Sequence, residues 1–600
     1  MGYQSMSLHS HSPGGTAPRL MRGGSAGATK PAARRLGSTA ALVSRRALQW
    51  APAPLHRLAR GGRPVASASA LPSEVDVVVI GSGFGGLSCG ALLARYGYSV
   101  AVCESHTAPG GVAHAFERTT DRGTYKFDSG PSFYCGLSSP KGQSTSALKQ
   151  VLDIIGEDVD VATYNQWQCY FPEGPFTCRA EPEFYREQLA RYCSPEGMQQ
   201  WAELERRMRP LSKFTAAAPF AAMRSDAGMA LTMARYGGGL WESGLIQSAG
   251  LGALSLLEGP FSDLVDEIVT DPFLKKMIDL ECFVITGQLA GGSPTPEMTF
   301  MYEERHKEGA ILDYPVGGAE ALINALVRGL EKHGGSLHLG QHVEEVMVEG
   351  GRAAGVRLRG GAAIKAREAV VTNASIWDTT RMLPPGCVPP SWLEGCVKTP
   401  ETGSFMHLHL GIDAEGLPSG AELGIHHLVV NDWELGVGAP SNVINISIPS
   451  ALDPGLAPPG CHNIHVYTAG NEPWDLWENM KRGSPEYLAL KEERVQCCWQ
   501  AIEKVIPDVR ARAEVALVGT PLTHKRFNRR HNGTYGPRIC GGMNVWPGPE
   551  TPLPGLLACG DSTFPGIGVP AAAGSGMIAA NSLVSPLVHL KTLDAMSQSE

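Results

Sequence analysis

Runs of apolar residues predict the first folded elements of the chain soon after residue 70. The β-branched run Val75–Ile80 predicts a buried strand, Leu87–Tyr96 predicts a helix, and Ser99–Cys103 predicts a second strand. A strand, a helix and a strand over about 30 residues form a βαβ unit, so we expect a parallel sheet near the start of the folded chain.

The hydrophobic pattern then changes along the chain. Residues 150–300 predict mainly helices, interrupted by proline and glycine. Alternating runs within residues 403–470 predict an antiparallel sheet, with strands at Ser404–Ile412, Ile425–Asn431, Val443–Ile448 and Asn463–Thr468. Near the end of the chain, the apolar run Leu556–Cys559 predicts a buried strand, and a helix of small residues is expected over Pro570–Leu587.

A glycine-rich turn joins the first predicted strand to the first predicted helix. Its sequence is Gly81-Ser82-Gly83-Phe84-Gly85-Gly86, which fits the pattern GxGxxG. Glycines here allow a tight turn, close approach of a pyrophosphate, and close packing of the helix on the strand. Glu104 ends the second strand, where its carboxylate can accept hydrogen bonds from adenosine ribose hydroxyls. The pattern predicts a dinucleotide site.

Further segments favour FAD over a nicotinamide cofactor. Gly110-Gly111 follows Glu104 closely and would extend the backbone wall around a longer cofactor. Gly560-Asp561 follows the late strand, where a carboxylate can bind ribitol hydroxyls or a pyrophosphate-bound water. Gly568-Val569 begins the last helix, whose N-terminus can stabilise negative charge on a reduced flavin. Val343, in a strand predicted over His342–Val348, is the remaining residue expected to bind the cofactor.

These segments together resemble the phytoene desaturase and carotenoid cis–trans isomerase (prolycopene isomerase) group of the FAD amine-oxidase-like superfamily. Besides the glycine segments and Glu104, the resemblance is carried by Phe127–Pro131, Asp279–Phe283, Tyr314–Gly318, Asn532–Pro537 and Gly560–Gly566. It spans about residues 74–590. The segment Ile567–Ala571 is closer to desaturases and isomerase-like paralogues, so the reaction type stays open between isomerisation and desaturation.

The resemblance implies an α/β flavoprotein of the two-dinucleotide-binding-fold type. Its FAD domain is expected to be glutathione-reductase-like and discontinuous, built from residues 74–150, 305–385 and 540–600. Residues 151–304 and 386–539 are expected to form an α+β substrate domain that contains the antiparallel sheet.

The resemblance also implies an FAD-dependent enzyme that acts on a long apolar polyene. The first hypothesis is cis-to-trans isomerisation of a prolycopene-like carotenoid by reduced flavin. An FAD-dependent carotenoid desaturase, or an oxidoreductase similar to retinol saturase, is the alternative. A flavin-free prenyl or lipid carrier of the GDP-dissociation-inhibitor type fits less well, because the glycine turn, Glu104 and Asp561 are all present.

Candidate acid–base groups are few, and the catalytic residue stays unassigned. Asp279 and Glu281 lie in an apolar stretch where burial would raise their pKa values, although carboxylates in a surface ion pair are the stronger interpretation. Arg529 and His531 lie just before the Asn532–Pro537 motif. They either contact the flavin or the substrate, or they are charged groups on an exposed loop. We expect no metal site. A group of histidines, His407, His409 and His465, either lines the cavity or forms a polar sheet face, which is the preferred interpretation.

The first 70 residues differ in composition from the rest of the chain. They hold nine Arg, one Lys and no Asp or Glu, and they are rich in Ser, Ala and Gly, as transit peptides are. We expect a disordered transit peptide that directs the chain to the chloroplast, with the mitochondrion, or a basic tail that binds nucleic acid or lipid, as alternatives. Without this segment the formal net charge falls from −8 to −18, which argues against nucleic acid as a partner of the folded part.

The remaining composition suits a globular enzyme with an apolar ligand. The 14 cysteines form no CxxC pair, which gives no support to a zinc ribbon and suits a reducing compartment. No run reaches the roughly 20 apolar residues of a membrane-spanning helix. Large apolar side chains within residues 211–260 predict either a peripheral membrane contact at the entrance for a lipophilic substrate or ordinary core helices. The oligomeric state stays unpredicted.

Overall fold

A seven-stranded sheet gathers strands from distant parts of the chain. In the computed structural model, which describes residues 70–245, 253–306, 310–540 and 547–597, one sheet path runs in the order β10-β2-β1-β13-β12-β11 and β19 also pairs with β13. The bounds are β1 Glu74–Ile80, β2 Val100–Glu104, β10 Ser336–Leu339, β11 Val343–Glu349, β12 Arg352–Leu358, β13 Ala363–Thr372 and β19 Leu556–Ala558. Strands β10, β2, β1, β13 and β19 pair in parallel, whereas β11, β12 and β13 are antiparallel.

Strand β1 is apolar almost throughout because both faces of this sheet are covered. Val77 and Val79 pack in one buried cluster with leucines of the following helix. Val78 and Ile80 point the other way, into a cluster with β11 and β12. A doubly covered parallel strand has no polar face, so the run of valines is what this position requires.

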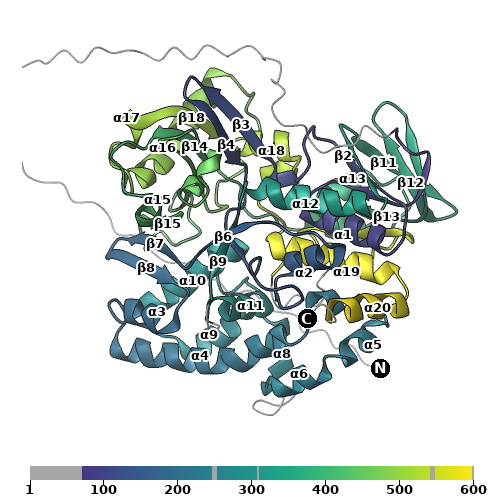
Figure 1. Cartoon of the computed structure of the whole chain (residues 1–600), viewed down its shortest axis with the longest axis horizontal. Coiled ribbons are helices and arrows are strands. Elements are labelled where there is room, and N and C mark those ends of the chain that lie inside the picture. The colour runs from purple at the N-terminus through teal and green to yellow at the C-terminus, as the bar shows by residue number, and fades with distance from the viewer. Residues whose placement is uncertain (1–69, 246–252, 307–309, 541–546, 598–600) are drawn as a thin grey trace, which may run out of the picture. The chain divides into compact units, whose positions relative to one another are not determined.

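Three helices from the start, middle and end of the chain cover one face of this sheet (Figure 1). They are α1 (Phe84–Arg95), α12 (Ala319–Lys332) and α19 (Val569–Leu583), and α1 packs on both of the others. A Cβ atom added to Gly576 would lie 2.2 Å from the backbone oxygen of Gly85, so α1 and α19 approach more closely than any side chain allows. The single helix predicted over Pro570–Leu587 is wrong: α19 ends at Leu583 and α20 (Pro586–Ser597) begins at a proline, which breaks the helical backbone before it.

The second large sheet has the order β18-β14-β17-β16-β15-β7-β8. The four strands predicted within residues 403–470 are present as β14 (His407–Asp413), β15 (His426–Val430), β16 (Val443–Ser447) and β17 (Cys461–Thr468), and β18 spans Ala513–Gly519. Residues 150–300 are mainly helical, as predicted, but they also contain three strands that the sequence analysis missed: β6 (Val161–Tyr164), β7 (Gln166–Phe171) and β8 (Gly174–Arg179). Strand β7 forms a hairpin with β8 and pairs in parallel with β15, whereas β6 pairs with β9 (Leu312–Pro315) in a separate small sheet.

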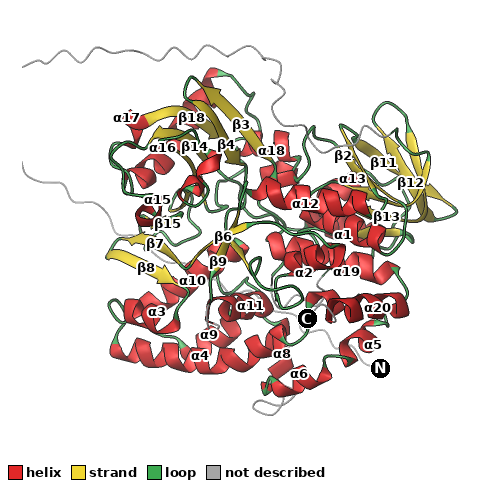
Figure 2. Ribbon diagram, viewed as in Figure 1, coloured by secondary structure: helices red, strands yellow, loops and turns green. Residues whose placement is uncertain are grey.

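Helices pack on one side of the strands β7 and β8 (Figure 2). They include α3 (Pro182–Leu189), α4 (Pro195–Ala216), α9 (Ser262–Ile268), α10 (Pro272–Thr286) and α11 (Thr295–His306). Among the described residues, no helix is both long enough and apolar enough to cross a membrane.

The remaining helices and strands connect these layers. The helices are α2 Ala147–Ile155, α5 Met229–Ala234, α6 Gly237–Glu242, α8 Ala253–Glu258, α13 Ile376–Arg381, α14 Pro390–Lys398, α15 Gly420–Leu423, α16 Pro485–Glu503, α17 Val509–Arg512 and α18 Pro521–Asn528. The strands are β3 Ala115–Thr120, β4 Gly123–Asp128, β5 Tyr134–Cys135 and β9 Leu312–Pro315. The discontinuous domain boundaries proposed from the sequence stay a prediction, and the transit-peptide prediction concerns residues that, apart from Ala70, lie outside the described part of the chain.

Candidate active site

Four parallel strands end at the same edge of the first sheet. In register, Ile80 of β1 lies beside Cys103 of β2 and Thr372 of β13, and Thr372 lies beside Ala558 of β19. The residues that follow these strands therefore meet in space. This edge, at the carboxyl ends of parallel strands, is where α/β folds bind their ligands.

The glycine turn after β1 is shaped by contacts that exclude a side chain. A Cβ atom on Gly85 would lie 2.7 Å from Asn373 Oδ1 and 2.8 Å from the backbone nitrogen of Gly560. A Cβ atom on Gly86 would lie 2.1 Å from the backbone oxygen of Gly81. The turn is thus wedged between its own strand and the residues that follow β13 and β19, which leaves its exposed backbone free to line a cavity.

Glu104 ties the end of β2 to this turn. Its carboxylate accepts hydrogen bonds from the backbone nitrogen of Ser82 (2.9 Å), from the Ser82 hydroxyl (2.7 Å) and from the backbone nitrogen of His106 (2.7 Å). The backbone nitrogen of Gly110 donates to the Ser82 carbonyl at 3.0 Å, so the second glycine segment lies against the first. The structure brings together residues that the sequence analysis assigned to one cofactor.

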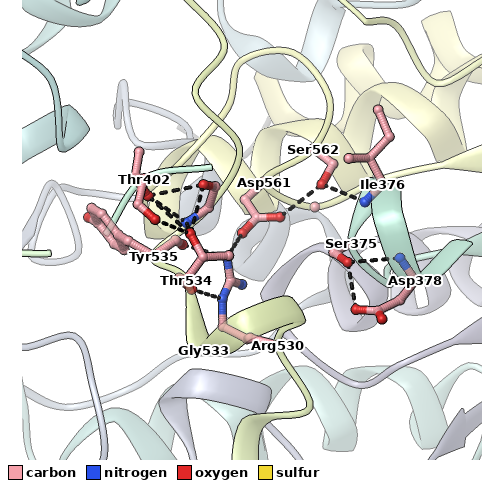
Figure 3. Close-up of polar contacts among 12 residues, drawn as sticks. Ser375, Ile376, Asp378, Thr402, Arg530, Gly533, Thr534, Tyr535, Asp561 and Ser562 are labelled. Atoms are coloured by element: carbon pink, nitrogen blue, oxygen red, sulfur yellow. Dashed lines mark hydrogen bonds and ion pairs between the residues drawn. The ribbon is translucent and has the colours of Figure 1, made fainter. Parts of the chain in front are cut away.

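Asp561 is held in place by Arg530 (Figure 3). The Arg530 guanidinium forms an ion pair with the Asp561 carboxylate, and it also donates to the backbone oxygens of Thr534 (2.7 Å) and Tyr535. Arg530 therefore connects the Asn532–Pro537 motif to the turn after β19. The Ser562 hydroxyl next to it accepts a hydrogen bond from the backbone nitrogen of Ile376 (3.1 Å), which fixes the same turn to α13.

One large cavity of about 1820 Å³ extends from this sheet edge. It is larger than the roughly 300–1,000 Å³ of a site for one drug-sized ligand, so it has room for a dinucleotide and a second long molecule. Of the residues expected to bind the cofactor, all except Gly86 line it: Gly81, Ser82, Gly83, Phe84, Gly85, Glu104, Gly110, Gly111, Val343, Gly560, Asp561, Gly568 and Val569.

The other end of the cavity is apolar. Its wall comes mainly from α10, α11 and the described residues within 214–257, and it includes Phe214, Phe220, Met223, Met233, Leu240, Leu257, Met277, Leu280, Val284, Phe300 and Met301. Several apolar residues of the 211–260 region thus line the cavity, whereas Leu231 and Trp241 are 49% and 61% exposed. The short helices α5 and α6 therefore line the cavity on one side and expose apolar side chains to the outside on the other.

Comparison with known proteins agrees with this geometry. The family described as flavin containing amine oxidoreductase matches residues 84–584. The chain belongs to this family. It is therefore an FAD-dependent enzyme, and the match gives no support to a flavin-free carrier.

Individual relatives narrow the comparison. The chloroplastic prolycopene isomerase of Arabidopsis thaliana is 31% identical over 86% of this chain and 83% of that protein. The neurosporene-forming phytoene desaturase of Cereibacter sphaeroides is 25% identical over 85% and 94%, and the all-trans-retinol 13,14-reductase of Danio rerio is 24% identical over 82% and 83%. Putrescine oxidase, solved with putrescine bound, shares the fold with a TM-score of 0.54 at 14% identity, over 85% of this chain and 98% of that one.

Within this flavoprotein, the two carboxylates proposed as acid–base groups have different surroundings. Glu281 lines the cavity but is paired with Arg305 at 2.8 Å and accepts a hydrogen bond from the Tyr185 hydroxyl at 2.6 Å. Asp279 is not among the cavity-lining residues, and its carboxylate accepts from the backbone nitrogen of Ala290 at 3.0 Å. Burial raises the pKa of Asp279. Glu281 is thus held by Arg305 and Tyr185, which gives it a structural role in this arrangement.

Arg529 and His531 both line the cavity; Arg529 is exposed in the loop after α18, as one of the two alternatives had it, whereas His531 is half-buried. Burial, followed by the charges of Arg359 and Arg529, lowers the pKa of His342, which also lines the cavity. His531 stacks on Trp377, with ring centres 4.6 Å apart. These positions suit contact with a cofactor better than contact with a substrate in the apolar end.

The histidines on β14 and β17 form a buried stack. His407 Nδ1 and His465 Nε2 are 2.9 Å apart, and the rings of His409 and His465 are 4.2 Å apart. Desolvation lowers the pKa of all three, to about 4 for His409, so they are neutral at physiological pH. They thus form a polar face on the adjacent strands β14 and β17, but this face is buried, and His407 and His465 line the cavity. Within the described ranges, no group of three or more His, Cys, Asp or Glu side chains is placed to hold a metal ion.

Sequence reasoning missed three residues of this site. Asn373 follows β13 and lies between the two glycine turns, and its only sequence signal was its place after a predicted strand. Arg530 stands between two residues that were considered, Arg529 and His531. Glu297 lines the cavity, and desolvation raises its pKa to about 8. No local pattern marks it, because the apolar surroundings come from distant segments.

Proposed function

We propose that this FAD enzyme converts cis double bonds of a long carotenoid-like polyene to trans. The observation that carries the proposal is the single cavity, which joins a dinucleotide end to an apolar end large enough for a second ligand. The likeness to prolycopene isomerases, at 31% identity, supports a polyene as that ligand.

The glycine turns and their neighbours would hold the cofactor. Glu104 would accept hydrogen bonds from the adenosine ribose, the backbone nitrogens of the Gly81–Gly86 turn would bind the pyrophosphate, and Gly110, Gly111 and Val343 would line the adenosine half. Asp561 would bind the ribitol or pyrophosphate part, and the backbone nitrogens of Gly568 and Val569, at the N-terminus of α19, would stabilise negative charge on the flavin. When bound, the flavin supplies reversible electron or hydride donation to a conjugated chain.

The apolar end would orient the substrate and keep water away from it. Aromatic and aliphatic side chains of α10 and α11 contact a polyene along its length without offering polar groups that would have to lose hydration. Among the described residues no motif for a protein nucleophile was found, and none is required for this reaction.

Desaturation by oxidised flavin is the second candidate. The specific observation in its favour is the likeness of 25% identity to a phytoene desaturase over 94% of that protein. Both reactions use the same cavity, and they differ in whether the product has lost two hydrogens.

The test is anaerobic incubation of the purified holoprotein with tetra-cis-lycopene or with phytoene, with the flavin either reduced or oxidised. We expect all-trans product of unchanged mass, formed only with reduced flavin. A product lighter by two hydrogens, formed with oxidised flavin, would replace isomerisation by desaturation. Absence of turnover with either polyene overturns the carotenoid assignment.

We also propose that the enzyme acts in the chloroplast at a membrane surface. The plant relatives are chloroplastic proteins, and the basic, acid-free segment 1–70 suits import into that organelle. Leu231 of α5, Trp241 of α6 and Leu587 of α20 expose large apolar side chains, and α5 packs on α20. Because α5 and α6 also line the cavity, a membrane contact here would let a lipid-soluble substrate enter directly.

A further inference from the structure

Glu297 lies where the two ends of the cavity meet. It belongs to the first turn of α11, and its half-buried side chain lines the cavity. It also borders a small recess shared with Asp561, Gly566 and Ile567, which belong to the turn that leads into α19. The carboxyl group is therefore next to the segment expected to meet the flavin and on the same helix as Phe300 and Met301 of the apolar wall.

This carboxyl group differs from the other buried carboxylates by having no polar partner. No hydrogen bond or ion pair joins it to another residue in the described part of the chain. Glu281 has Arg305 and Tyr185, Glu104 has three donors, and Asp128 accepts from the Tyr314 hydroxyl at 2.8 Å. Desolvation alone raises the pKa of Glu297 to about 8, so the neutral acid predominates at physiological pH. A half-buried carboxyl group that faces a cavity, has a raised pKa and has no partner among the described residues is a candidate functional group.

The surrounding groups do not compete for its proton. The titratable groups that face it are the Tyr535 phenol, the Cys282 thiol and the Asp561 carboxylate. Burial raises the pKa of Tyr535 and of Cys282 above their usual values, and Asp561 is paired with Arg530. Glu297 is thus a proton donor that faces an apolar space. Its place in the first turn of α11 lets backbone N–H groups stabilise the carboxylate left after proton transfer.

We propose that Glu297 is the acid that protonates the polyene and then takes a proton back, a role that rests on the proposed isomerase function. In the first step the O–H bond of Glu297 breaks, and the electron pair of one C=C bond forms a C–H bond. The positive charge spreads along the remaining conjugated chain and lowers the order of the cis bond, which rotates. The carboxylate then removes a proton from the same carbon and the double bond re-forms. No electrons are gained or lost overall, so the product has the mass of the substrate.

The test is to run the isomerisation in D₂O and measure deuterium in the all-trans product by mass spectrometry. The wild-type holoprotein should give a product that carries deuterium. Glu297→Gln should lower both the rate and the labelling at least 100-fold while the flavin absorption spectrum stays unchanged, and Glu297→Asp should restore part of both. Glu303→Gln is the matched control, because Glu303 lies on the same helix outside the cavity lining and accepts from Ser212 at 2.8 Å.

The outcomes separate this role from the proposed function. Unlabelled all-trans product from the wild-type protein, or a Glu297→Gln variant that isomerises at the wild-type rate, overturns the role of Glu297 and leaves the isomerase function standing. A wild-type protein that turns over no cis polyene, with reduced flavin, overturns both. The labelling result on the wild-type protein decides the question even where a variant fails to fold.

Discussion

The two ends of the cavity are built in opposite ways. At the dinucleotide end the backbone defines the surface: the glycine turns after β1 and β19 fit against Asn373 with no space for a side chain. At the apolar end side chains define it, and they come from α10, α11 and the described residues within 214–257. A surface formed by closely packed glycine backbone tolerates no side chain, so its sequence shows a recognisable local motif. A surface formed by apolar side chains from distant segments tolerates substitution, so its sequence shows no such motif.

The strongest way to break this contrast is to place a side chain in the backbone-defined end. Gly85→Val puts a Cβ atom within 3 Å of Asn373 Oδ1 and of Gly560, neither of which can move without shifting a strand end. We expect a protein without bound flavin, seen as loss of absorbance near 450 nm, and a lower melting temperature. Gly395→Ala is the control, since a Cβ atom there meets nothing within 4 Å; equal loss of flavin in both variants would contradict the argument.

Where the two ends meet, the largest expected effect belongs to Glu297. The folded-state pKa of Glu297 lies at about 8, above the 4.5 of an unperturbed glutamate, so its proton stabilises the fold fully below pH 4.5 and this contribution is lost as the pH rises through about 8. At about 1.4 kcal/mol per pH unit, this amounts to a fall of up to about 4 kcal/mol in the free energy of unfolding between about pH 5 and about pH 8. Glu297→Gln should remove this part of the pH dependence, measured by denaturant unfolding across that range. An unchanged pH profile would mean that the carboxyl group is not desolvated.

The fold was predictable where the chain shows local regularity. The valines of β1, the glycine turn and the alternating strands β14 to β17 each have a pattern a few residues long, and these predictions are confirmed by the sheets. Strand β7 was missed because the run Gln166–Phe171 mixes polar and aromatic residues. Its partner strand β15 is about 260 residues away in sequence, so no local pattern indicates the pairing.

The site was predictable to the same degree and for the same reason. Glu104 ends β2 and Asp561 lies in the turn shortly after β19, so the parallel sheet brings them to one edge. Arg530 was missed because its partner Asp561 is 31 residues away, and Glu297 because desolvation is a property of the packed interior and not of its neighbours in sequence. Asp279 and Glu281 were chosen for their apolar neighbours in sequence, yet Glu281 forms an ion pair with Arg305, a residue on another helix.

The junction between the two ends can be tested through Arg530. Arg530→Ala leaves the Asp561 carboxylate without its cation and frees the Thr534 and Tyr535 backbone oxygens, so the turn that meets the cofactor should loosen. We expect about 2 kcal/mol of lost stability and roughly a tenfold weaker affinity for FAD, measured by titration of the apoprotein. The exposed pair of Arg206 and Glu203 provides the control, because Arg206→Ala removes an ion pair that solvent screens. Similar losses of stability and FAD affinity in both variants would show that Arg530 contributes no more to the site than an exposed ion pair does.

The smallest expected effect concerns the outer surface of the apolar end. Replacing Leu231, Trp241 and Leu587 by serine removes three exposed apolar side chains from α5, α6 and α20 and leaves the cavity lining intact. If these helices contact a membrane, binding to lipid vesicles should fall about tenfold while the flavin content is unchanged, and KM for a polyene supplied in vesicles should rise with kcat unaffected. The matched variant replaces Leu393, Val397 and Leu435, which are also exposed but lie outside the cavity-lining helices. Equal loss of vesicle binding in the two variants would mean that binding depends on exposed apolar area in general, and that α5, α6 and α20 form no specific membrane contact.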